Sequence, residues 1–187
     1  TAYDDWAIFV GALGATWLLT PLARKLALRK GIVDKPDVRK QHRDPVPYLG
    51  GIAVFGGLLV GLTALLFFAR DPAKSFERLD GKVLAMVLGA CAMFLTGLVD
   101  DTRHLRARHK LLIQLLVASL MWCCGIRIEG ITLSETLVLD FGVFSFPITV
   151  LWIAGVTNAI NFIDGLDGLA AGIGAISAAA IGFVAFS

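Results

Sequence analysis

Six apolar runs separated by polar or charged segments most strongly constrain what this chain can fold into. A helix that spans a bilayer needs about 20 mainly apolar residues, and several of the runs approach that length. Of the 187 residues, 57% are hydrophobic and 17% are charged, whereas an ordinary globular domain has about 25% charged residues. We therefore predict an all-α polytopic membrane protein, with residues 1–187 in a single integral-membrane domain. The six predicted transmembrane helices cover residues 6–22, 48–69, 83–99, 111–126, 146–156 and about 168–187.

Basic residues cluster in two of the segments between the runs, and their placement predicts the orientation. Asp4 and Asp5 precede the first run and basic residues follow it, which is the reverse of a signal peptide. Because Lys and Arg concentrate in cytoplasmic loops, the N-terminus is predicted to lie outside. Cytoplasmic loops are predicted near residues 24–47, 100–110 and 158–168. The first two hold 12 of the 17 basic residues: Arg24, Lys25, Arg29, Lys30, Lys35, Arg39, Lys40, Arg43, Arg103, Arg106, Arg108 and Lys110.

Three further patterns predict local structure. In residues 127–145 apolar residues alternate with polar or small ones, which predicts a short β-hairpin on the extracytoplasmic side. Gly56, Gly57 and Gly61 lie in the second run and would let a neighbouring helix pack closely. The three prolines of the 24–47 segment argue against one continuous helix, so an ordered loop is predicted there.

Other classes of site and partner are disfavoured. Cys91, Cys123 and Cys124 lie in apolar runs without metal-ligand spacing, so we interpret them as small buried hydrophobic residues. No run of Lys and Arg interleaved with aromatic residues indicates nucleic acid as a partner. The membrane itself is the predicted partner.

Carboxylates and amides gather at the predicted cytoplasmic ends of the helices. Asp100 and Asp101 follow the third run, and a second polar group follows the fifth. Ionisable groups near hydrocarbon are costly and tend to be kept for function. Carboxylates at a helix C-terminus also oppose the helix dipole, so we interpret the pair as functional rather than as ordinary helix-end residues. The second group consists of Asn158, Asn161, Asp164 and Asp167.

For other polar residues two interpretations stay open. Arg108 and Lys110 either bind substrate or set the topology and contact lipid headgroups. Asn158 either binds substrate or hydrogen-bonds a neighbouring helix. Of the three histidines, His42 is the one we favour as a binding residue, because it lies beside Lys40.

Oxygen ligands beside basic residues predict a magnesium-diphosphate site. Mg²⁺ usually takes one or two carboxylates and completes its shell with phosphate and water, and Mn²⁺ is the alternative metal. Lys and Arg beside the carboxylates would repel a bare cation but accept one that carries phosphates. Such a site neutralises charge during phosphoryl transfer. Its position at the ends of membrane helices predicts a lipid phosphate as one substrate.

Three motifs, taken together, point to a family. They are DKPDVRKQH (34–42) with PVP (45–47) and GG (50–51), DD (100–101) with Arg108 and Lys110 downstream, and NAINFIDGLDGL (158–169). With these motifs the chain resembles the polyprenyl-phosphate N-acetylhexosamine-1-phosphate transferases. Within them it is most similar to the undecaprenyl-phosphate GlcNAc-1-phosphate transferase-like members of bacterial glycosyltransferase family 4.

The resemblance implies an enzyme of about ten or eleven transmembrane helices, of which this chain supplies the first six and is truncated after them. It implies that undecaprenyl or another polyprenyl phosphate attacks the β-phosphorus of a UDP-N-acetylamino sugar, with Mg²⁺ bound. The products would be a lipid diphosphosugar and UMP, in the first membrane step of cell-envelope glycan synthesis. The enzyme would lie in the bacterial cytoplasmic membrane with its active site facing the cytoplasm.

The form of the third motif favours UDP-N-acetylglucosamine over UDP-muramoyl-pentapeptide, whose transferase belongs to the same family and is the alternative. A membrane transporter and a non-catalytic scaffold are the alternatives outside the family. The later Gly-Asp motif and the His-rich loop of the family are not among residues 1–187. This stretch alone is therefore expected to be inactive, and a homodimer is one assembly open to the whole enzyme.

The resemblance also implies roles for individual residues. The implied catalytic residues are Asp100, Asp101, Asp164 and Asp167. The implied substrate-binding residues are Lys40, His42, Arg108, Lys110, Asn158 and Asn161. The implied metal neighbours are Asp100, Asp101 and Asn161.

Overall fold

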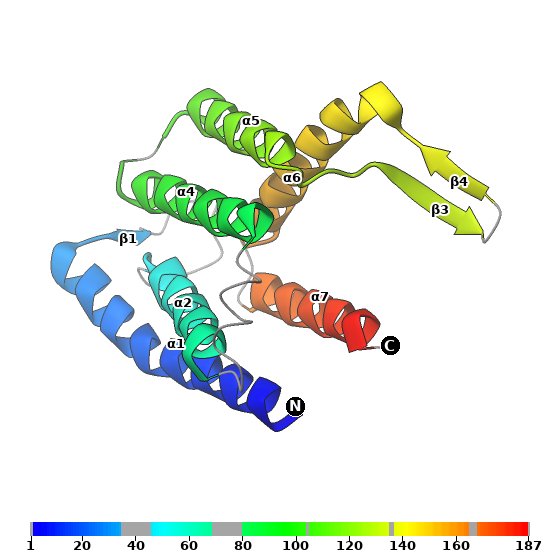
Figure 1. Cartoon of the computed structure of the whole chain (residues 1–187). Helices are drawn as coiled ribbons and strands as arrows, with labels where there is room; N and C mark the ends of the chain where they lie inside the picture. Colours follow the sequence, from blue (N-terminus) through cyan, green and yellow to red (C-terminus); the bar gives the residue numbers. More distant parts are fainter. Residues whose placement is uncertain are drawn as a thin grey trace. The chain divides into compact units, whose positions relative to one another are not determined.

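Helices make up most of the structure, which is a computed structural model. It describes residues 2–34, 46–68, 80–103, 105–134, 137–164 and 168–186. Within these residues the six α-helices are α1 (Ala2–Lys30), α2 (Gly50–Phe68), α4 (Gly81–Arg103), α5 (Ala107–Cys123), α6 (Ser145–Ile163) and α7 (Leu169–Phe186) (Figure 1). The short elements are β1 (Val33–Asp34), β2 (Val46–Pro47), β3 (Gly130–Ser134), β4 (Leu137–Asp140) and the 3-10 helix η1 (Gly142–Phe144). The described residues thus contain six helices, as predicted, while the prediction that all six cross a membrane stays a prediction.

The chain divides into two compact units, Thr1–Ile113 and Gln114–Ser187, and each is described by itself. The first unit contains α1, α2, α4 and the β1–β2 pair. The second contains most of α5, the β3–β4 hairpin, α6 and α7. The prediction that all 187 residues form one integral-membrane domain stays a prediction.

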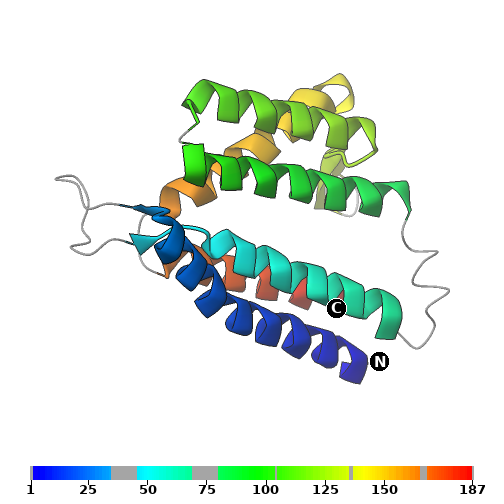
Figure 2. The ribbon, with the colours of Figure 1, turned by 90° about the vertical axis from the view of Figure 1, so that its left-hand side faces the viewer.

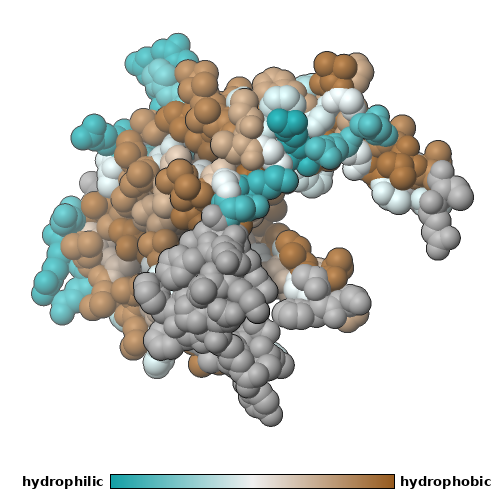
Figure 3. All heavy atoms as spheres, viewed as in Figure 1, coloured by the Kyte–Doolittle hydropathy of each residue, from teal (hydrophilic) through white to brown (hydrophobic). Residues whose placement is uncertain are grey.

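Among the described residues, large apolar side chains are exposed and small ones are buried, the opposite of the arrangement in a water-soluble protein. Most of the buried apolar residues are small, such as Ala27 and Ala118, each with 0% of its surface exposed. Large apolar side chains lie outside, among them Trp17, which is 76% exposed, and Phe162, which is 85% exposed. Figure 3 shows brown, hydrophobic side chains over much of the described surface in view. Small residues between helices and large apolar residues outside are typical of proteins packed in lipid.

Two described helical segments, Gly81–Arg103 and Gly142–Ile163, are long and apolar enough to cross a membrane by length and composition. Two shorter apolar helical segments, Gly50–Leu65 and Leu169–Val184, fall below that length. Asp80 determines where the first of these spans begins, because its Oδ1 accepts the backbone N–H groups of Lys82 and Val83 at 3.0 and 2.9 Å. A side chain that accepts such bonds satisfies donors that the first helical turn leaves unpaired.

Helices α1 and α2 lie side by side, and three glycines of α2 face α1 (Figure 2). A Cβ atom at Gly57 would clash with the Thr16 hydroxyl and would lie 2.8 Å from the carbonyl oxygen of Ala12. A Cβ at Gly61 would lie 3.1 Å from the Cβ of Ala12, and one at Gly56 would lie 2.6 Å from Leu19 Cδ1. The prediction that these glycines serve close helix packing is confirmed.

Helix α1 continues to Lys30, so the prediction that the loop begins at Arg24 is wrong. The segment after the apolar run consists of Leu, Ala, Arg and Lys, all good helix formers, and Arg29 and Lys30 lie in the last turn, where cations complement the helix dipole. The helix ends at Gly31, which has φ +67°. There the N–H of Gly31 bonds the carbonyl of Leu28 at 3.3 Å and the N–H of Ile32 bonds that of Ala27 at 2.9 Å, which is the Schellman end of a helix.

The predicted β-hairpin is present within residues 127–145. Strands β3 and β4 pair antiparallel, with Ile131 opposite Leu139 and Thr132 opposite Val138. Gly130 is required at the start, because a Cβ there would lie 2.5 Å from the carbonyl oxygen of Leu139. The extracytoplasmic location of the hairpin stays a prediction.

Candidate functional site

Asp100 lies in the last turns of α4 and closes the connection to α5. Its Oδ2 pairs with Lys110 Nζ at 2.8 Å, and its Oδ1 accepts the backbone N–H of Leu105 at 3.0 Å. The two paired side chains are largely buried, at 26% exposed for Asp100 and 18% for Lys110. The helix dipoles disfavour both charges, the carboxylate at the C-terminus of α4 and the ammonium at the N-terminus of α5. The ion pair between Asp100 and Lys110 compensates for both placements.

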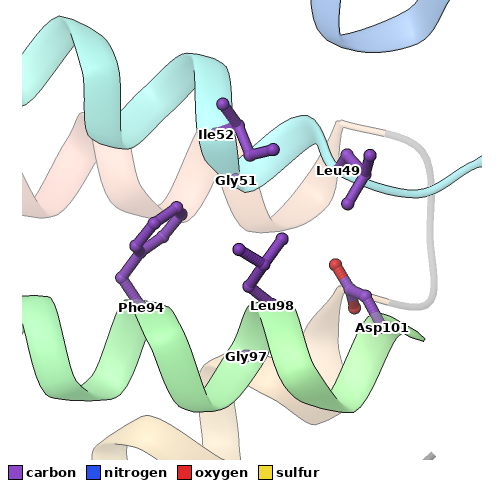
Figure 4. A pocket seen from close by; sticks show the side chains of 7 residues that line it. All are labelled: Leu49, Gly51, Ile52, Phe94, Gly97, Leu98 and Asp101. Carbon is purple, nitrogen blue, oxygen red and sulfur yellow. The ribbon is translucent and has the colours of Figure 1, made fainter. Parts of the chain in front are cut away.

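Asp101, the next residue, faces a different environment. It lines a cavity of about 160 Å³ between the start of α2 and the end of α4. Figure 4 shows its carboxylate at the end of α4, directed toward the α2 side beside Leu49. The other lining residues are Gly51, Ile52, Phe94, Gly97 and Leu98. Two adjacent carboxylates therefore have separate surroundings, one in an ion pair and the other at the edge of an apolar cavity.

The wall of this cavity is held by aromatic stacking. Phe55 of α2 and Phe94 of α4 lie parallel, with ring centroids 4.2 Å apart and an interplanar angle of 4°. Gly51 belongs to the first sequence motif and Asp101 to the second, and the structure brings both to one cavity. Among the described residues, and apart from the chain neighbours and the backbone of the same helix, no heavy atom lies within 4 Å of where a Cβ of Gly51 or Gly97 would be.

The predicted loop near residues 100–110 is largely helical, so its predicted extent is wrong. Helix α4 runs to Arg103 and α5 begins at Ala107. The Asp100 side chain stabilises this short connection, because its Oδ1 accepts the N–H of Leu105, which lies between the two helices. Arg108, a predicted substrate-binding residue, is exposed in the first turn of α5.

Asn158 and Asn161 lie on α6, so the prediction of a loop from residue 158 is also wrong. Asn158 Nδ2 donates to Gln114 Oε1 of α5 at 2.6 Å and to the carbonyl oxygen of Ala154 at 2.8 Å. These bonds satisfy the amide group inside the helix bundle, so tertiary contacts override the weak helix propensity of Asn. Of the two interpretations of Asn158, the structure therefore shows the hydrogen bond to a neighbouring helix.

The end of α6 presents the remaining polar groups of the third motif. Asn161 is exposed one turn after Asn158, and Asp164 is exposed as the C-terminal cap residue, with its N–H bonded to the carbonyl of Ile160 at 3.1 Å. Asp167 lies outside the described residues. Gly168, with φ +77°, precedes α7, which begins at Leu169, close to the start of about residue 168 that the sequence predicted for the last helix.

Two predicted binding residues of the first motif, Lys40 and His42, also lie outside the described residues. The structure does describe the two ends of that segment. Val33 pairs with Pro47 and Asp34 with Val46, and the N–H of Tyr48 bonds the carbonyl of Ile32 at 3.1 Å. The β1–β2 pair therefore holds the two ends of this segment together, next to the end of α1.

Among the residues that the structure describes, no group of three or more His, Cys, Asp or Glu side chains is placed to hold a metal ion. Mg²⁺ does not require such a group, because one or two carboxylates are enough when phosphate and water complete its shell. Asp101 at the end of α4 and Asp164 at the end of α6, each considered within its own unit, carry oxygen atoms of the type that this metal prefers.

Sequence reasoning missed Gln114, which is 1% exposed. A signal was available, because Gln114 interrupts the apolar run of residues 111–126 and lies one helical turn after Lys110. It also missed Ser145 and Thr149 of α6. The Ser145 hydroxyl accepts from Trp122 Nε1 at 3.3 Å, and the Thr149 hydroxyl accepts from the backbone N–H of Ile128 at 2.9 Å.

Comparison with known proteins places the chain among transferases. The family model described as "Glycosyl transferase family 4" matches residues 83–187. The chain is 36% identical over 180 residues to a probable undecaprenyl-phosphate N-acetylglucosaminyl 1-phosphate transferase of Bacillus subtilis, covering 96% of this chain and 48% of that protein. It is 37% identical over 175 residues to a decaprenyl-phosphate N-acetylglucosaminephosphotransferase of Mycolicibacterium smegmatis, covering 89% and 41%.

A relative with a different sugar substrate in its name is also similar. The chain is 30% identical over 183 residues to a phospho-N-acetylmuramoyl-pentapeptide-transferase of Halalkalibacterium halodurans, covering 91% of this chain and 54% of that protein. The chain spans about half the length of the curated relatives it matches. Since the family match covers more than half of its residues, the chain belongs to glycosyl transferase family 4, a family of phospho-sugar transferases.

Proposed function

We propose that the full-length protein containing this chain transfers N-acetylglucosamine 1-phosphate from UDP-N-acetylglucosamine to a polyprenyl phosphate in the cytoplasmic membrane. The names of the relatives at 36% and 37% identity support this acceptor and this sugar. The exposed large apolar side chains and the two candidate spans support a membrane location. The active site would face the cytoplasm, where the sequence predicts its basic loops to lie.

The placement of Asp101 is the single observation that carries the proposal. A polyprenyl phosphate has an apolar chain and an anionic head, and the cavity offers an apolar wall with one carboxylate at its edge. A carboxylate repels a bare phosphate but binds it through a divalent cation. Asp101 would thus hold the metal-phosphate group, while Asp100 acts through its ion pair with Lys110.

In the proposed reaction an oxygen of the lipid phosphate attacks the β-phosphorus of the nucleotide sugar. The new P–O bond joins lipid and sugar phosphates, the bond from that phosphorus to the bridging oxygen breaks, and UMP leaves with that oxygen. Mg²⁺, with Mn²⁺ as the alternative, would supply charge neutralisation on the diphosphate when bound. A lipid phosphate is already mostly ionised near neutral pH, so positioning and electrostatic stabilisation contribute more than proton removal.

The remaining predicted residues would complete the site. We propose Asn161 and Asp164 at the end of α6 as contacts of the metal or diphosphate, together with Asp167, which lies outside the described residues. Lys40, His42 and Arg108 would bind the nucleotide sugar through charge and hydrogen bonds.

The test uses the purified full-length protein in lipid nanodiscs with polyprenyl phosphate, UDP-N-acetylglucosamine and Mg²⁺. Release of UMP is expected, and Asp101→Asn should lower it by about 100-fold or more, since removing one transition-state contact costs that much. The matched control is Asp140→Asn at the end of β4, which keeps an oxygen acceptor for Gly142 N–H and should leave turnover unchanged. Removal of divalent metal should stop turnover, and Mn²⁺ should restore part of it. Unchanged turnover in Asp101→Asn would remove this residue from the mechanism.

A second candidate function within the family is supported by the 30% identity to the pentapeptide transferase. The same assay distinguishes the two when UDP-muramoyl-pentapeptide replaces UDP-N-acetylglucosamine. Turnover with the pentapeptide substrate alone would reverse the assignment of the sugar and leave the phosphoryl-transfer chemistry intact.

A further inference from the structure

We propose that Gln114 and Asn158 form a positioning pair that sets the rotation of α6 and so places Asn161 and Asp164 for the reaction. The catalytic part of this inference rests on the proposed function, because it uses turnover as a readout. Neither residue needs to touch substrate. The pair would act through the orientation of the helix that carries the exposed end of the third motif.

The hydrogen bonds of Asn158 are the first support. An amide nitrogen has two hydrogens to donate, and Asn158 Nδ2 donates to Gln114 Oε1 at 2.6 Å and to the carbonyl of Ala154 at 2.8 Å. Both donor positions are therefore used inside the protein. This favours a positioning role for Asn158 over the substrate contact that the sequence left open.

The burial of Gln114 is the second support. The residue is 1% exposed and lies on α5 near Val117 and Ala118, which are also buried. Burying an amide is costly unless it is hydrogen-bonded, and an apolar residue would pack there without that cost. The bond from Asn158 satisfies the side-chain oxygen Oε1 of Gln114 and so offsets part of the cost of burying it. The two residues therefore depend on each other across the two helices.

Helix geometry converts this bond into a position for the reactive end. Asn161 and Asp164 follow Asn158 by three and six residues, which is about 4.5 and 9 Å along the axis at 1.5 Å per residue. Side-chain atoms lie about 5–6 Å from the axis, so a rotation of about 10° moves them by about 1 Å. A displacement of that size in a group that positions substrate can cost about 100-fold in rate.

The test begins with Gln114→Met in the full-length protein, a change that keeps the length of the side chain and removes its hydrogen bond. We expect kcat to fall about 100-fold, with the KM for UDP-N-acetylglucosamine changed less than about threefold, because the substrate contacts remain. The exchange Gln114→Asn with Asn158→Gln keeps one long and one short amide facing each other, and it should recover at least tenfold of the lost kcat. The matched control is Ser119→Ala on α5, whose hydroxyl bonds only the carbonyl of Leu115 in its own helix at 2.8 Å among the contacts described.

A second measurement needs no turnover. In protein with the three native cysteines replaced, Asn161→Cys introduces a thiol whose labelling rate with a water-soluble maleimide reports its exposure. Adding Gln114→Met should change that rate by at least about threefold, whereas adding Ser119→Ala should not. Because this assay is independent of the reaction, a protein that fails to release UMP still reports on the pair.

Three results would overturn the proposal. An unchanged labelling rate in Gln114→Met would show that the bond does not set the position of Asn161. An unchanged kcat in the same variant would show that the position does not matter for the reaction. A raised KM in Asn158→Leu, together with a normal kcat in Gln114→Met, would assign Asn158 to substrate binding instead.

Discussion

Two helix pairs in this protein are held together by opposite means. Helices α1 and α2 approach closely because Gly56, Gly57 and Gly61 have no side chains, and residues such as Thr16 of α1 fill the space. The pair formed by α5 and α6 is joined instead by polar side chains that reach across, including the Gln114–Asn158 bond. The first contact depends on volume and the second on individual polar atoms.

This difference determines what each pair can control. Close packing of small residues resists added volume, but dispersion contacts have little directional preference. Hydrogen bonds are directional, so the bonds between α5 and α6 fix rotation as well as distance. Helix α6 carries the first residues of the third sequence motif, where we propose that substrate is positioned and where orientation would matter most. We therefore expect added volume to damage the first pair and the loss of a single polar atom to damage the second.

The largest effect is expected from Gly57→Val. The added side chain would clash with the Thr16 hydroxyl and press on the carbonyl of Ala12, and overpacking of this kind costs about 3 kcal/mol at the upper end of its usual range. The free energy of unfolding of the purified protein in mixed micelles measures it. The control is Gly11→Ala on α1, whose new Cβ would meet no described atom of another element within 4 Å and which should stabilise the helix by about 0.5–1 kcal/mol. Equal effects at the two positions would contradict the close approach of α1 and α2.

A smaller effect is expected from Thr149→Val on α6. The Thr149 side chain is 1% exposed, and its Oγ1 accepts the backbone N–H of Ile128 at 2.9 Å while donating to the carbonyl of Ser145 at 2.7 Å. Valine has nearly the same shape but leaves the N–H of Ile128 without that acceptor, at a cost of about 1–2 kcal/mol. The same unfolding measurement applies.

Thr157→Val provides the matched control for that change. The Thr157 hydroxyl bonds the carbonyl of Ile153 at 2.8 Å within α6, so its loss should leave stability within about 0.5 kcal/mol. If the two threonine variants were equally stable, single polar atoms would not be what joins α6 to the segment after α5.

Sequence reasoning predicted the contacts of the first pair better than those of the second. Three glycines at helical spacing in an apolar run have one common use, so Gly56, Gly57 and Gly61 could be assigned to packing from the sequence alone. The Gln114–Asn158 bond could not be predicted, because the partner of a lone polar residue depends on how two helices are rotated. The sequence indicated only that Asn158 could bond some neighbouring helix.

The helix ends show a second limit of the sequence. Apolar runs mark the part of a helix that meets lipid, but helices extend into polar sequence until a residue such as Gly31 adopts a positive φ. For this reason α1 continues through a basic segment and α6 through Asn158 and Asn161. The adjacent residues Asp100 and Asp101 were equivalent in the sequence. Their separate surroundings follow from side-chain direction, which places one against Lys110 and the other at the cavity.

The smallest effect is expected from Arg127→Gln, which tests the far end of the α5–α6 contact. The Arg127 guanidinium lies 4.3 Å from the centre of the Trp122 ring, and its Nε donates to the carbonyl of Trp122 at 3.0 Å. Trp122 in turn bonds Ser145 of α6 through Nε1 at 3.3 Å. In the contacts that the structure describes, Arg127 therefore acts on the pair through the tryptophan, and an exposed cation over an aromatic ring contributes about 0.5–1 kcal/mol.

The measurement for Arg127→Gln is again the free energy of unfolding. Arg127→Lys is the comparison that keeps a cation but cannot reproduce the planar stacking and the Nε bond, so it should recover only part of the loss. A loss larger than that of Thr149→Val would contradict the order proposed here, because a contact that only supports Trp122 would then outweigh a direct bond to α6. A smaller loss supports the view that buried polar atoms between α5 and α6, rather than the exposed contacts at their ends, hold the orientation of the third motif.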